Sequence, residues 1–279
     1  MDHSANPPVV LITGCSRRGI GHSLCEAFAA RGCRVYASSR GLESAFANTS
    51  IRPLVMDVTS DESVRKAVEH VIREAGRVDI VVANAGIPCH GPVLDIPIKY
   101  ASLAMDTNVL GVLRLAQATL PHMASRKQGT FVTVGSVVGH TTTPWSGVYA
   151  ASKAATHAIT ETLQMEARAL SPNIHVMLVV PAGIKSNIAD NSTFQLPETS
   201  LYKAYLPSIA ARLRVSQQPG ASMPTATFAN AVVQATLRKG GPPREFTYGA
   251  QTRLFTIMRW LPKGVALWYL WRRMAQFKS

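Results

Sequence analysis

Short apolar runs alternate with longer amphipathic stretches along most of the chain. From Val9 onwards, runs rich in β-branched residues occupy 9–13, 33–38, 51–58, 78–86, 129–136 and 173–183. Continuous apolar runs of this length are typical of parallel strands covered on both faces. We therefore predict strands of a parallel sheet at these positions, completed by a short strand near 245–248.

Helical patterns fill the intervals between these runs, at about 20–31, 61–75, 97–125, 147–170 and 225–239. Each strand-helix-strand step is expected to be right-handed, and the simplest topology is then an α/β fold with a doubly wound parallel sheet, the Rossmann fold. A chain of 279 residues, 47% of them hydrophobic, has enough material for one buried core. We predict a single domain over 9–250, an N-terminal extension over 1–8 and a C-terminal tail over 251–279.

One segment, 185–224, interrupts the pattern. It mixes apolar side chains with Pro197, Pro207, Pro219 and Pro224. We interpret it as a mobile segment over a substrate cleft. No internal repeat or low-complexity tract is found.

A glycine-rich turn follows the first predicted strand and leads straight into a helical pattern. It reads Thr13-Gly-Cys-Ser-Arg-Arg-Gly-Ile-Gly21. Glycines permit a tight turn and close backbone approach, while a helix N-terminus offers free N–H groups to a pyrophosphate. Many turns are rich in glycine, so it is the position of this one that favours a dinucleotide site. The residues assigned to the cofactor here are Gly14, Ser16, Arg17, Arg18, Gly19 and Ile20.

The end of the second predicted strand bears on the choice of cofactor. An acidic residue there would bind the ribose hydroxyls of NAD, but the sequence is Ser38-Ser39-Arg40. Arg40, with Arg17 or Arg18 from the glycine turn, has the guanidinium geometry that pairs with a 2′-phosphate. We therefore predict NADP(H); the alternative is that these arginines are ordinary solvated surface charges.

Tyr149 and Lys153 open the predicted helix 147–170, and their spacing of four places them on one helix face. A neighbouring ammonium favours the phenolate, so we expect Lys153 to lower the pKa of Tyr149, which then acts as acid or base. Ser136 can donate a hydrogen bond to a carbonyl oxygen that gains charge as a hydride arrives. A packed tyrosine beside a surface lysine is the plain alternative. The position of the pair, 13 residues after Ser136 and downstream of the glycine turn, favours catalysis.

These motifs together resemble the short-chain dehydrogenase/reductase family over about residues 8–250. The matching positions, besides the glycine turn, are Asp57, Asn84-Ala85-Gly86, Asn108, Ser136, Tyr149, Lys153 and Pro181-Ala-Gly-Ile-Lys-Ser186.

The resemblance implies a role for each motif. Asp57 contacts the adenine, Asn84-Ala85-Gly86 supports the cofactor and the sheet, and Tyr149 and Lys153 contact the cofactor as well as catalysing. Ile184 and Ser186 flank the nicotinamide. Asn108 is implied to position a water beside Lys153 and complete a proton relay. The alternatives are a turn or cap for Asp57, a loop former for Asn84 and a satisfied buried amide for Asn108.

Two departures from the family pattern narrow the resemblance. Four residues separate Gly14 from Gly19 where the family has three, so the loop is expected to bulge and present Arg17 or Arg18 differently. Pro181-Ala182-Gly183 replaces the common Pro-Gly. With these features the chain is most similar to fungal NADPH-dependent 1-acyldihydroxyacetone-phosphate reductases, although relatives with the same motifs serve secondary metabolism, including terpenoid and meroterpenoid pathways.

Composition adds limits on compartment and partners. The four cysteines have no metal-ligand spacing and indicate free thiols, and His22, His90, His140 and His157 are interpreted as structural or surface residues, so no metal is predicted. The N-terminus does not resemble a secretory signal, which favours the cytoplasm. The net charge is +13, but no base-reading or stacking module accompanies it, so we predict no nucleic-acid partner.

The tail carries much of this charge. It holds Arg253, Arg259, Lys263, Arg272, Arg273 and Lys278, six aromatic residues and no acid. Its longest uncharged stretch, 264–271, is far shorter than the roughly 20 residues of a membrane-spanning helix. Two interpretations stay open: an interfacial segment on an anionic membrane, such as the endoplasmic reticulum or a lipid droplet, or a packed lid over the substrate pocket or a subunit interface.

The sequence thus predicts an NADPH-dependent oxidoreductase that moves hydride between the nicotinamide and a ketone or secondary alcohol on a bulky apolar substrate, such as an acyl-dihydroxyacetone phosphate. A ketoreductase of secondary metabolism is the alternative within the class. A non-catalytic NADP-binding regulatory protein is the alternative outside it, and the complete Ser136, Tyr149, Lys153 set argues against that. Family resemblance suggests a homodimer or homotetramer.

Overall fold

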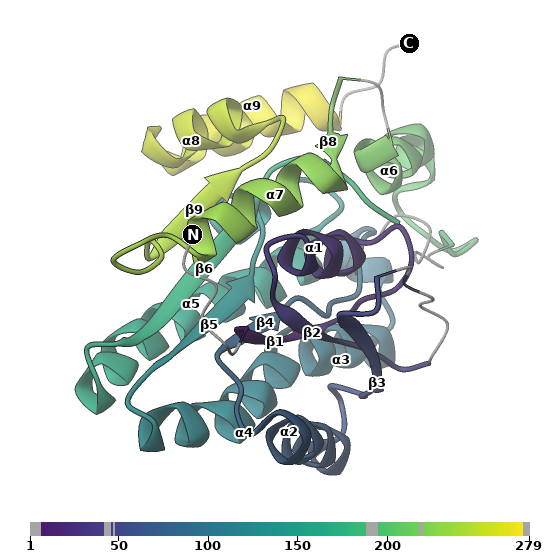
Figure 1. Ribbon diagram of the computed structural model, residues 1–279. Coiled ribbons are helices and arrows are strands. Elements are labelled where there is room, and N and C mark those ends of the chain that lie inside the picture. Colours follow the sequence, from purple (N-terminus) through teal and green to yellow (C-terminus); the bar gives the residue numbers. More distant parts are fainter. Residues whose placement is uncertain (1–6, 42–45, 47, 188–194, 218–219, 276–279) are drawn as a thin grey trace.

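The computed structural model describes residues 7–41, 46, 48–187, 195–217 and 220–275 (Figure 1). Most of the predicted N-terminal extension, part of the segment 185–224, and Phe277 and Lys278 of the tail lie outside these ranges.

A parallel sheet forms the centre of the molecule. Its strands follow the order β3-β2-β1-β4-β5-β6-β9, and every neighbouring pair is parallel. This doubly wound order confirms the predicted fold class, and the strand order changes direction between β1 and β4. The strands are β1 Val9–Thr13, β2 Arg34–Ser39, β3 Ile51–Val55, β4 Ile80–Ala83, β5 Gly129–Val134, β6 Ile174–Pro181 and β9 Glu245–Tyr248.

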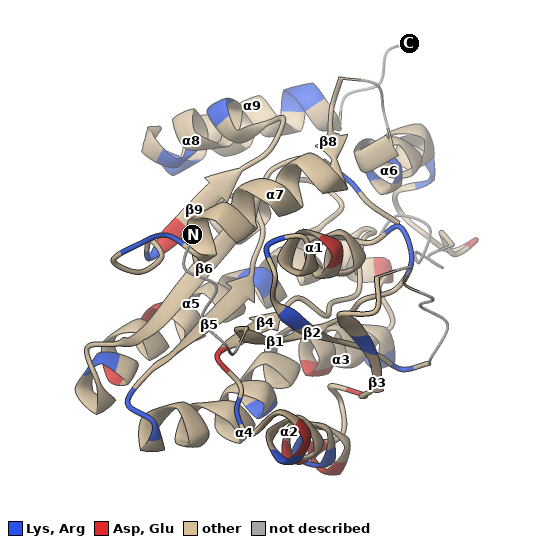
Figure 2. Ribbon diagram, viewed as in Figure 1, with Lys and Arg blue, Asp and Glu red and all other residues tan. Residues whose placement is uncertain are grey.

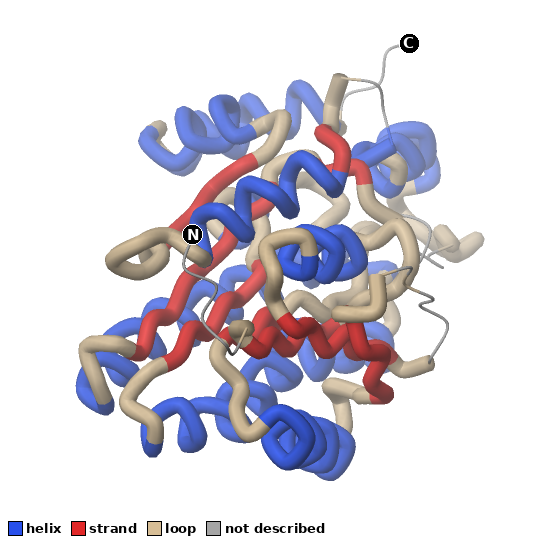
Figure 3. The backbone as a smooth tube through the Cα atoms, viewed as in Figure 1, coloured by secondary structure: helices blue, strands red, loops and turns tan. Residues whose placement is uncertain are grey.

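Helices cover both faces of this sheet (Figure 3). In β1, Val10 and Ile12 pack into the cluster formed with α1 and α7, whereas Val9 and Leu11 pack into the cluster formed with α2, α4 and α5. Alternate residues of a strand point to opposite faces, so a continuous apolar run fills two cores at once. The helices are α1 Ile20–Ala29, α2 Asp61–Ala75, α4 Gly111–Ser125, α5 Gly147–Leu170 and α7 Thr225–Thr236.

The region predicted as one helix over 97–125 is divided. An α-helix, α3 (Ile98–Met105), passes into a π-helical stretch at Asp106–Leu110 before α4 begins at Gly111. π-turns inside helices are rare and occur frequently at functional sites. The apolar periodicity did not reveal this turn, because one extra residue shifts the helical phase without interrupting the run.

The segment 185–224 and the tail form structure that the sequence pattern did not predict. The short strands β7 (Ile184–Lys185) and β8 (Met223–Pro224) pair with each other at the two ends of this segment, and α6 spans Leu206–Leu213 within it. The tail folds into α8 (Thr252–Trp260) and α9 (Lys263–Met274), separated at Pro262. No helix in the described ranges is long and apolar enough to cross a membrane.

The tail packs on the domain. Phe255 of α8 is 8% exposed and lies in one cluster with Val137, Leu178 and Val180, while Ala275 packs with Trp145 and with Ile209 of α6. The inner face of the tail is therefore packed against the domain, as the lid interpretation predicts. Its outer face keeps large apolar side chains in solvent, including Trp260 at 84% and Trp268 at 58% exposed.

Candidate active site

The glycine turn lies at the carboxyl end of β1. The Gly19 N–H donates to Ser16 O at 3.1 Å, and Arg18 takes a φ of +62°, so the extra residue of this turn is accommodated in the left-handed region. A Cβ on Gly14 would lie 2.7 Å from Ala85 Cα, and a Cβ on Gly21 would lie 2.4 Å from Gly14 O. No described side chain caps α1 at Gly19, so its first amide N–H groups are open to an anion.

The three arginines proposed for a 2′-phosphate are placed differently. Arg40 lines the pocket beside Ser39 at the end of β2. Arg17 and Arg18 are exposed and are not among the residues that line it. Of the three, Arg40 is therefore the one in the pocket lining, and the assignment of a 2′-phosphate to these arginines stays a prediction.

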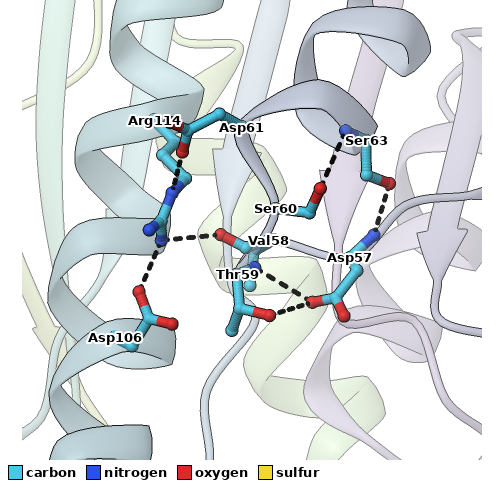
Figure 4. Close-up of polar contacts among 8 residues, drawn as sticks. All are labelled: Asp57, Val58, Thr59, Ser60, Asp61, Ser63, Asp106 and Arg114. Carbon is cyan, nitrogen blue, oxygen red and sulfur yellow. Dashed lines mark hydrogen bonds and ion pairs between the residues drawn. The ribbon is translucent and has the colours of Figure 1, made fainter.

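Asp57 follows β3 at the same edge of the sheet (Figure 4). Its Oδ1 accepts hydrogen bonds from the Thr59 N–H at 2.9 Å and the Thr59 hydroxyl at 2.8 Å, and its own N–H donates to Ser63 Oγ at 3.0 Å. Partial burial opposes ionisation, but the Thr59 hydrogen bonds and the nearby Arg40 and Arg114 guanidinium groups outweigh it and lower the pKa of Asp57. The side chain is therefore a fixed, ionised acceptor in the pocket wall.

Arg114 fastens this loop to α4, which sequence reasoning did not anticipate. Its Nη1 donates to Asp106 Oδ1 at 2.7 Å and to Val58 O at 3.2 Å, and its Nε donates to Asp61 at the start of α2 (Figure 4). One guanidinium thus joins α2, α4 and the loop that carries Asp57.

Asn84 ties the end of β4 to the end of β1. Its Nδ2 donates to Thr13 O at 2.8 Å and to Gly14 O at 3.1 Å, and the N–H groups of Asn84 and Ala85 both donate to the Thr13 hydroxyl. These bonds hold the glycine turn against β4. They connect neighbouring strands of the sheet, while the implied support of the cofactor by Asn84-Ala85-Gly86 stays a prediction.

Ser136, Tyr149 and Lys153 converge on the far end of the same pocket. Ser136 follows β5, and its hydroxyl is in hydrogen-bond contact with the Tyr149 phenol. Lys153, one turn along α5, is 5% exposed; its Nζ donates to Val134 O at 2.9 Å and lies 5.9 Å from the centre of the Tyr149 ring.

The titration of these groups differs from the sequence expectation. Burial raises the pKa of Tyr149 to about 12, against the opposing effects of Arg212 and the Ser136 hydrogen bond. Burial lowers the pKa of Lys153 to about 8. The expected lowering of the tyrosine pKa by Lys153 is therefore wrong for this structure, because desolvation of the phenol dominates. At neutral pH the phenol is protonated and is set to donate a proton.

Asn108 lies in the π-helical stretch and is fully buried. Its Oδ1 accepts from the Ile87 N–H at 2.8 Å, its Nδ2 donates to Ile87 O and to Ser152 Oγ, and its carbonyl accepts from the Thr156 hydroxyl. It does not line the pocket. These contacts bind α5 to the loop after β4, and the water-positioning role stays a prediction.

His157 forms a hydrogen bond with the backbone of Ser136, a role that the sequence analysis did not assign. Its Nε2 accepts from the Ser136 N–H at 3.2 Å, and its ring lies so close to Gly135 and Gly139 that a Cβ on either would meet it. Burial and nearby His140 lower the pKa of His157 to about 3, so the ring is neutral and can accept. Tyr149, Lys153 and His157 recur every four residues, which was the available signal.

Two further residues of the pocket were also missed. His90 is buried, lies edge-on to the Tyr149 ring at 5.0 Å, and has its pKa lowered to about 3 by burial and by Arg212. Arg212, from α6, reaches the same end of the pocket. Gln251, Phe255 and Met274 close it from the tail.

The pocket thus brings together most of the predicted site in a cavity of about 340 Å³. Of the predicted residues, those that line it are Gly14, Ser16, Gly19, Ile20, Arg40, Asp57, Asn84, Gly86, Ser136, Tyr149, Lys153, Ile184 and Ser186. No group of His, Cys, Asp or Glu within the described ranges could hold a metal ion.

Comparison with known proteins gives one consistent result. Residues 8–196 match the family described as short chain dehydrogenase. A short-chain dehydrogenase of Penicillium ochrochloron is 35% identical over 254 residues, which cover 88% of this chain and 89% of the relative. An NADPH-dependent 1-acyldihydroxyacetone phosphate reductase of Schizosaccharomyces pombe is 35% identical over 206 residues, covering 70% of this chain and 68% of that protein.

The fold comparison agrees. A short-chain dehydrogenase of Streptomyces avermitilis superposes with a TM-score of 0.78 at 26% identity, covering 91% of this chain and 92% of that one.

Proposed function

The chain belongs to the short-chain dehydrogenase family, and from this we propose that it is an NADPH-dependent oxidoreductase that reduces a ketone on a bulky, apolar substrate to a secondary alcohol. The observation that carries the proposal is the convergence of Ser136, Tyr149 and Lys153 on one pocket with the glycine turn and Arg40. The same groups serve the reverse oxidation.

The residues present fit a dinucleotide. Gly14 and Gly21 leave room for close backbone approach, α1 offers free N–H groups at the turn, and Asp57 is a fixed acceptor in the pocket wall. Arg40 stands where an acid would bind the ribose hydroxyls of NAD, which favours a 2′-phosphate. When bound, NADPH supplies the hydride to the carbonyl carbon.

The chain's own groups act on the carbonyl oxygen. The Ser136 hydroxyl donates a hydrogen bond to this oxygen as negative charge develops on it. The Tyr149 phenol, protonated at neutral pH, then gives its proton to the oxygen and forms the alcohol. Lys153, buried and still largely cationic with a pKa of about 8, stabilises the resulting phenolate until solvent returns the proton.

An apolar substrate is supported by a second cavity, which we call the aromatic groove. It measures about 670 Å³ and shares Thr143 with the active-site pocket. Its apolar walls come from α9, from the loop before α5 and from the segment that precedes α6, and include Trp145, Tyr202, Leu267, Trp268, Leu270 and Trp271. An acyl chain or a polycyclic skeleton would suit this groove. The reductase relative makes an acyl-dihydroxyacetone phosphate one candidate substrate, and a secondary metabolite is the alternative.

Replacement of Tyr149 by Phe tests the catalytic assignment. The change removes the proton donor and leaves the ring, so turnover of a ketone panel should fall at least about 100-fold, whereas NADPH affinity should change less than about 3-fold. Near-normal turnover would remove Tyr149 from its role. A wild-type protein that binds NADPH and reduces none of the panel would favour the non-catalytic alternative.

We also propose that the outer face of α8 and α9 binds an anionic lipid surface. Trp260 and Trp268 stand in solvent, and both helices carry basic but no acidic residues (Figure 2). Aromatic rings at headgroup depth beside cations are typical of interfacial segments.

Point substitutions are the better test of this surface, because Phe255 and Met274 line the active-site pocket and truncation would open it. Ile257→Ser with Trp260→Ser changes two exposed apolar positions of α8 that line neither cavity, so it should reduce co-sedimentation with phosphatidylserine-containing vesicles and leave ketone turnover intact. Met165→Ser, which removes an apolar side chain that is 65% exposed on α5, is the matched control. Unchanged vesicle binding of the double variant would contradict the proposal.

A further inference from the structure

Arg212 brings a positive charge to the substrate end of the pocket. It lies in the last turn of α6, a helix held against the body of the protein by Ile209, which is 1% exposed and packs with Trp145 and Ala275. Arg212 is half-buried and lines the active-site pocket together with Tyr149 and His90. The position of α6 therefore brings this side chain to the reacting groups.

No described carboxylate neutralises this guanidinium. Among the contacts of the described residues, Arg212 makes one hydrogen bond, from Nε to Thr143 Oγ1 at 3.4 Å, and no ion pair. Among the described residues that line the pocket, Asp57 is the one acid, and it belongs to the cofactor end. A charge partly removed from water without a partner is unfavourable, so an anion bound beside it would be stabilised.

The surrounding groups add no negative charge at this end. Burial lowers the pKa of Arg212 to about 10, so it stays cationic at neutral pH. The neighbouring His90 is neutral, and the Tyr149 phenol is protonated. The Lys153 ammonium adds a further positive charge and donates a hydrogen bond to Val134 O. The field at the substrate end is therefore positive, and the Arg212 guanidinium is one of its sources, close enough to Tyr149 to act electrostatically on the phenol.

We propose that Arg212 binds an anionic group, a phosphate or a carboxylate, that the substrate carries a few atoms from its reacting carbonyl. The hydrogen bond from Nε to Thr143 leaves the two terminal amino groups of the guanidinium for the ligand, and a guanidinium suits the oxygens of either anion. With the aromatic groove adjoining at Thr143, the pocket selects an amphiphile: an anionic end near Arg212 and an apolar chain in the groove. This inference rests on the proposed reductase function and names its substrate class.

Matched substrate pairs test the inference. The probes are 1-palmitoyl-dihydroxyacetone phosphate against 1-palmitoyl-dihydroxyacetone, and a long-chain 3-oxo acid against its methyl ester. For Arg212→Gln we expect kcat/KM to fall about 10- to 150-fold on the anionic member that the enzyme prefers, the range for a hydrogen bond to a charged group, and less than about 3-fold on its neutral partner. The pair that shows the effect distinguishes phosphate from carboxylate.

Arg214→Gln is the control, since Arg214 is exposed two residues further along the chain. It should leave both members of each pair unchanged. Arg212→Gln should also keep or raise the melting temperature, because it removes a partly buried charge that lacks a described counterion. A residue with a purely structural role would lower it.

Equal losses on the anionic and neutral members, with a shifted pH profile for both, would overturn the inference and make Arg212 a positioning residue for Tyr149. A wild type that prefers the neutral members would overturn it as well. If the wild type reduces none of the four, the proposed function fails instead, and calorimetric titration of the two anionic probes into wild type and Arg212→Gln then decides the anion site alone. Equal binding by both proteins would refute it.

Discussion

Two buried neutral histidines should make the protein lose stability on mild acidification. His157 is 4% exposed and His90 is 7% exposed, and burial lowers the pKa of each from its ordinary value of 6.5 to about 3. Between these values the unfolded chain binds a proton at each site and the folded protein does not. Stability is therefore fully present above pH 6.5 and declines as the pH falls towards 3.

The size of the effect follows from the shift. Going from pH 7 to pH 5.5 should cost about 1.2 kcal/mol for each histidine and about 2.5 kcal/mol for both, since one pKa unit corresponds to about 1.4 kcal/mol. The result is insensitive to the folded-state value, because pH 5.5 lies well above it. The pKa values of His122 and His140 are also lowered by burial, so the wild-type loss should exceed this sum.

Urea unfolding of wild type, His90→Gln, His157→Gln and the double variant at pH 8, 7 and 5.5 measures the contribution of each site. The values at pH 8 give the cost of altered packing, which is subtracted. Each substitution should then reduce the loss between pH 7 and 5.5 by about 1.2 kcal/mol, and the double variant by about twice that. A double variant with the same acid loss as wild type would refute the reasoning.

The burial that keeps His157 neutral also maintains its hydrogen bond with Ser136 in the active site. A protonated imidazole would carry a proton on both ring nitrogens and could no longer accept the Ser136 N–H. His157→Leu should therefore lower turnover as well as stability, since it leaves a half-buried N–H without an acceptor.

Two predictions concern the cofactor end. Arg40→Asp should lower kcat/KM with NADPH about 10- to 100-fold and narrow or invert the preference over NADH; Arg17→Asp, in the exposed part of the glycine turn, is the control, and a wild type that uses NADH equally well would show the phosphate assignment to be wrong. Gly21→Ala should lower both the melting temperature and NADPH affinity, because its Cβ would lie 2.4 Å from Gly14 O, whereas Gly264→Ala meets open space; fluorescence titration with NADPH and thermal unfolding of both variants check this.

The strands and the motif residues could be predicted because their signals are local. The run at 9–13 is β1 without adjustment, and Tyr149 and Lys153 lie one turn apart on a helix whose bounds, 147–170, were also predicted. Each of these features needs only the period of its own element and the residues beside it.

The tail was harder, although its signal was present. Phe255 and Met258, and likewise Ala266 and Leu270, are spaced by three or four and are the buried positions of α8 and α9. Arginine and lysine residues lie between these apolar positions, so the composition of the tail is that of a basic, aromatic segment, and the helical spacing of its buried residues is easily overlooked. Pro262, which divides the two helices, was the other local sign.

Arg212 could not have been predicted from its neighbours. Its role depends on where α6 docks, and α6 docks through Ile209 against Trp145 and Ala275, which are distant in the sequence. A basic residue at the end of a short amphipathic helix is ordinarily solvated. Here the side chain faces Tyr149 because three segments far apart in the chain meet over the carboxyl ends of the strands. Tyr149 and Lys153 can therefore be found from a local motif, whereas the position of Arg212 depends on how distant segments of the chain pack together.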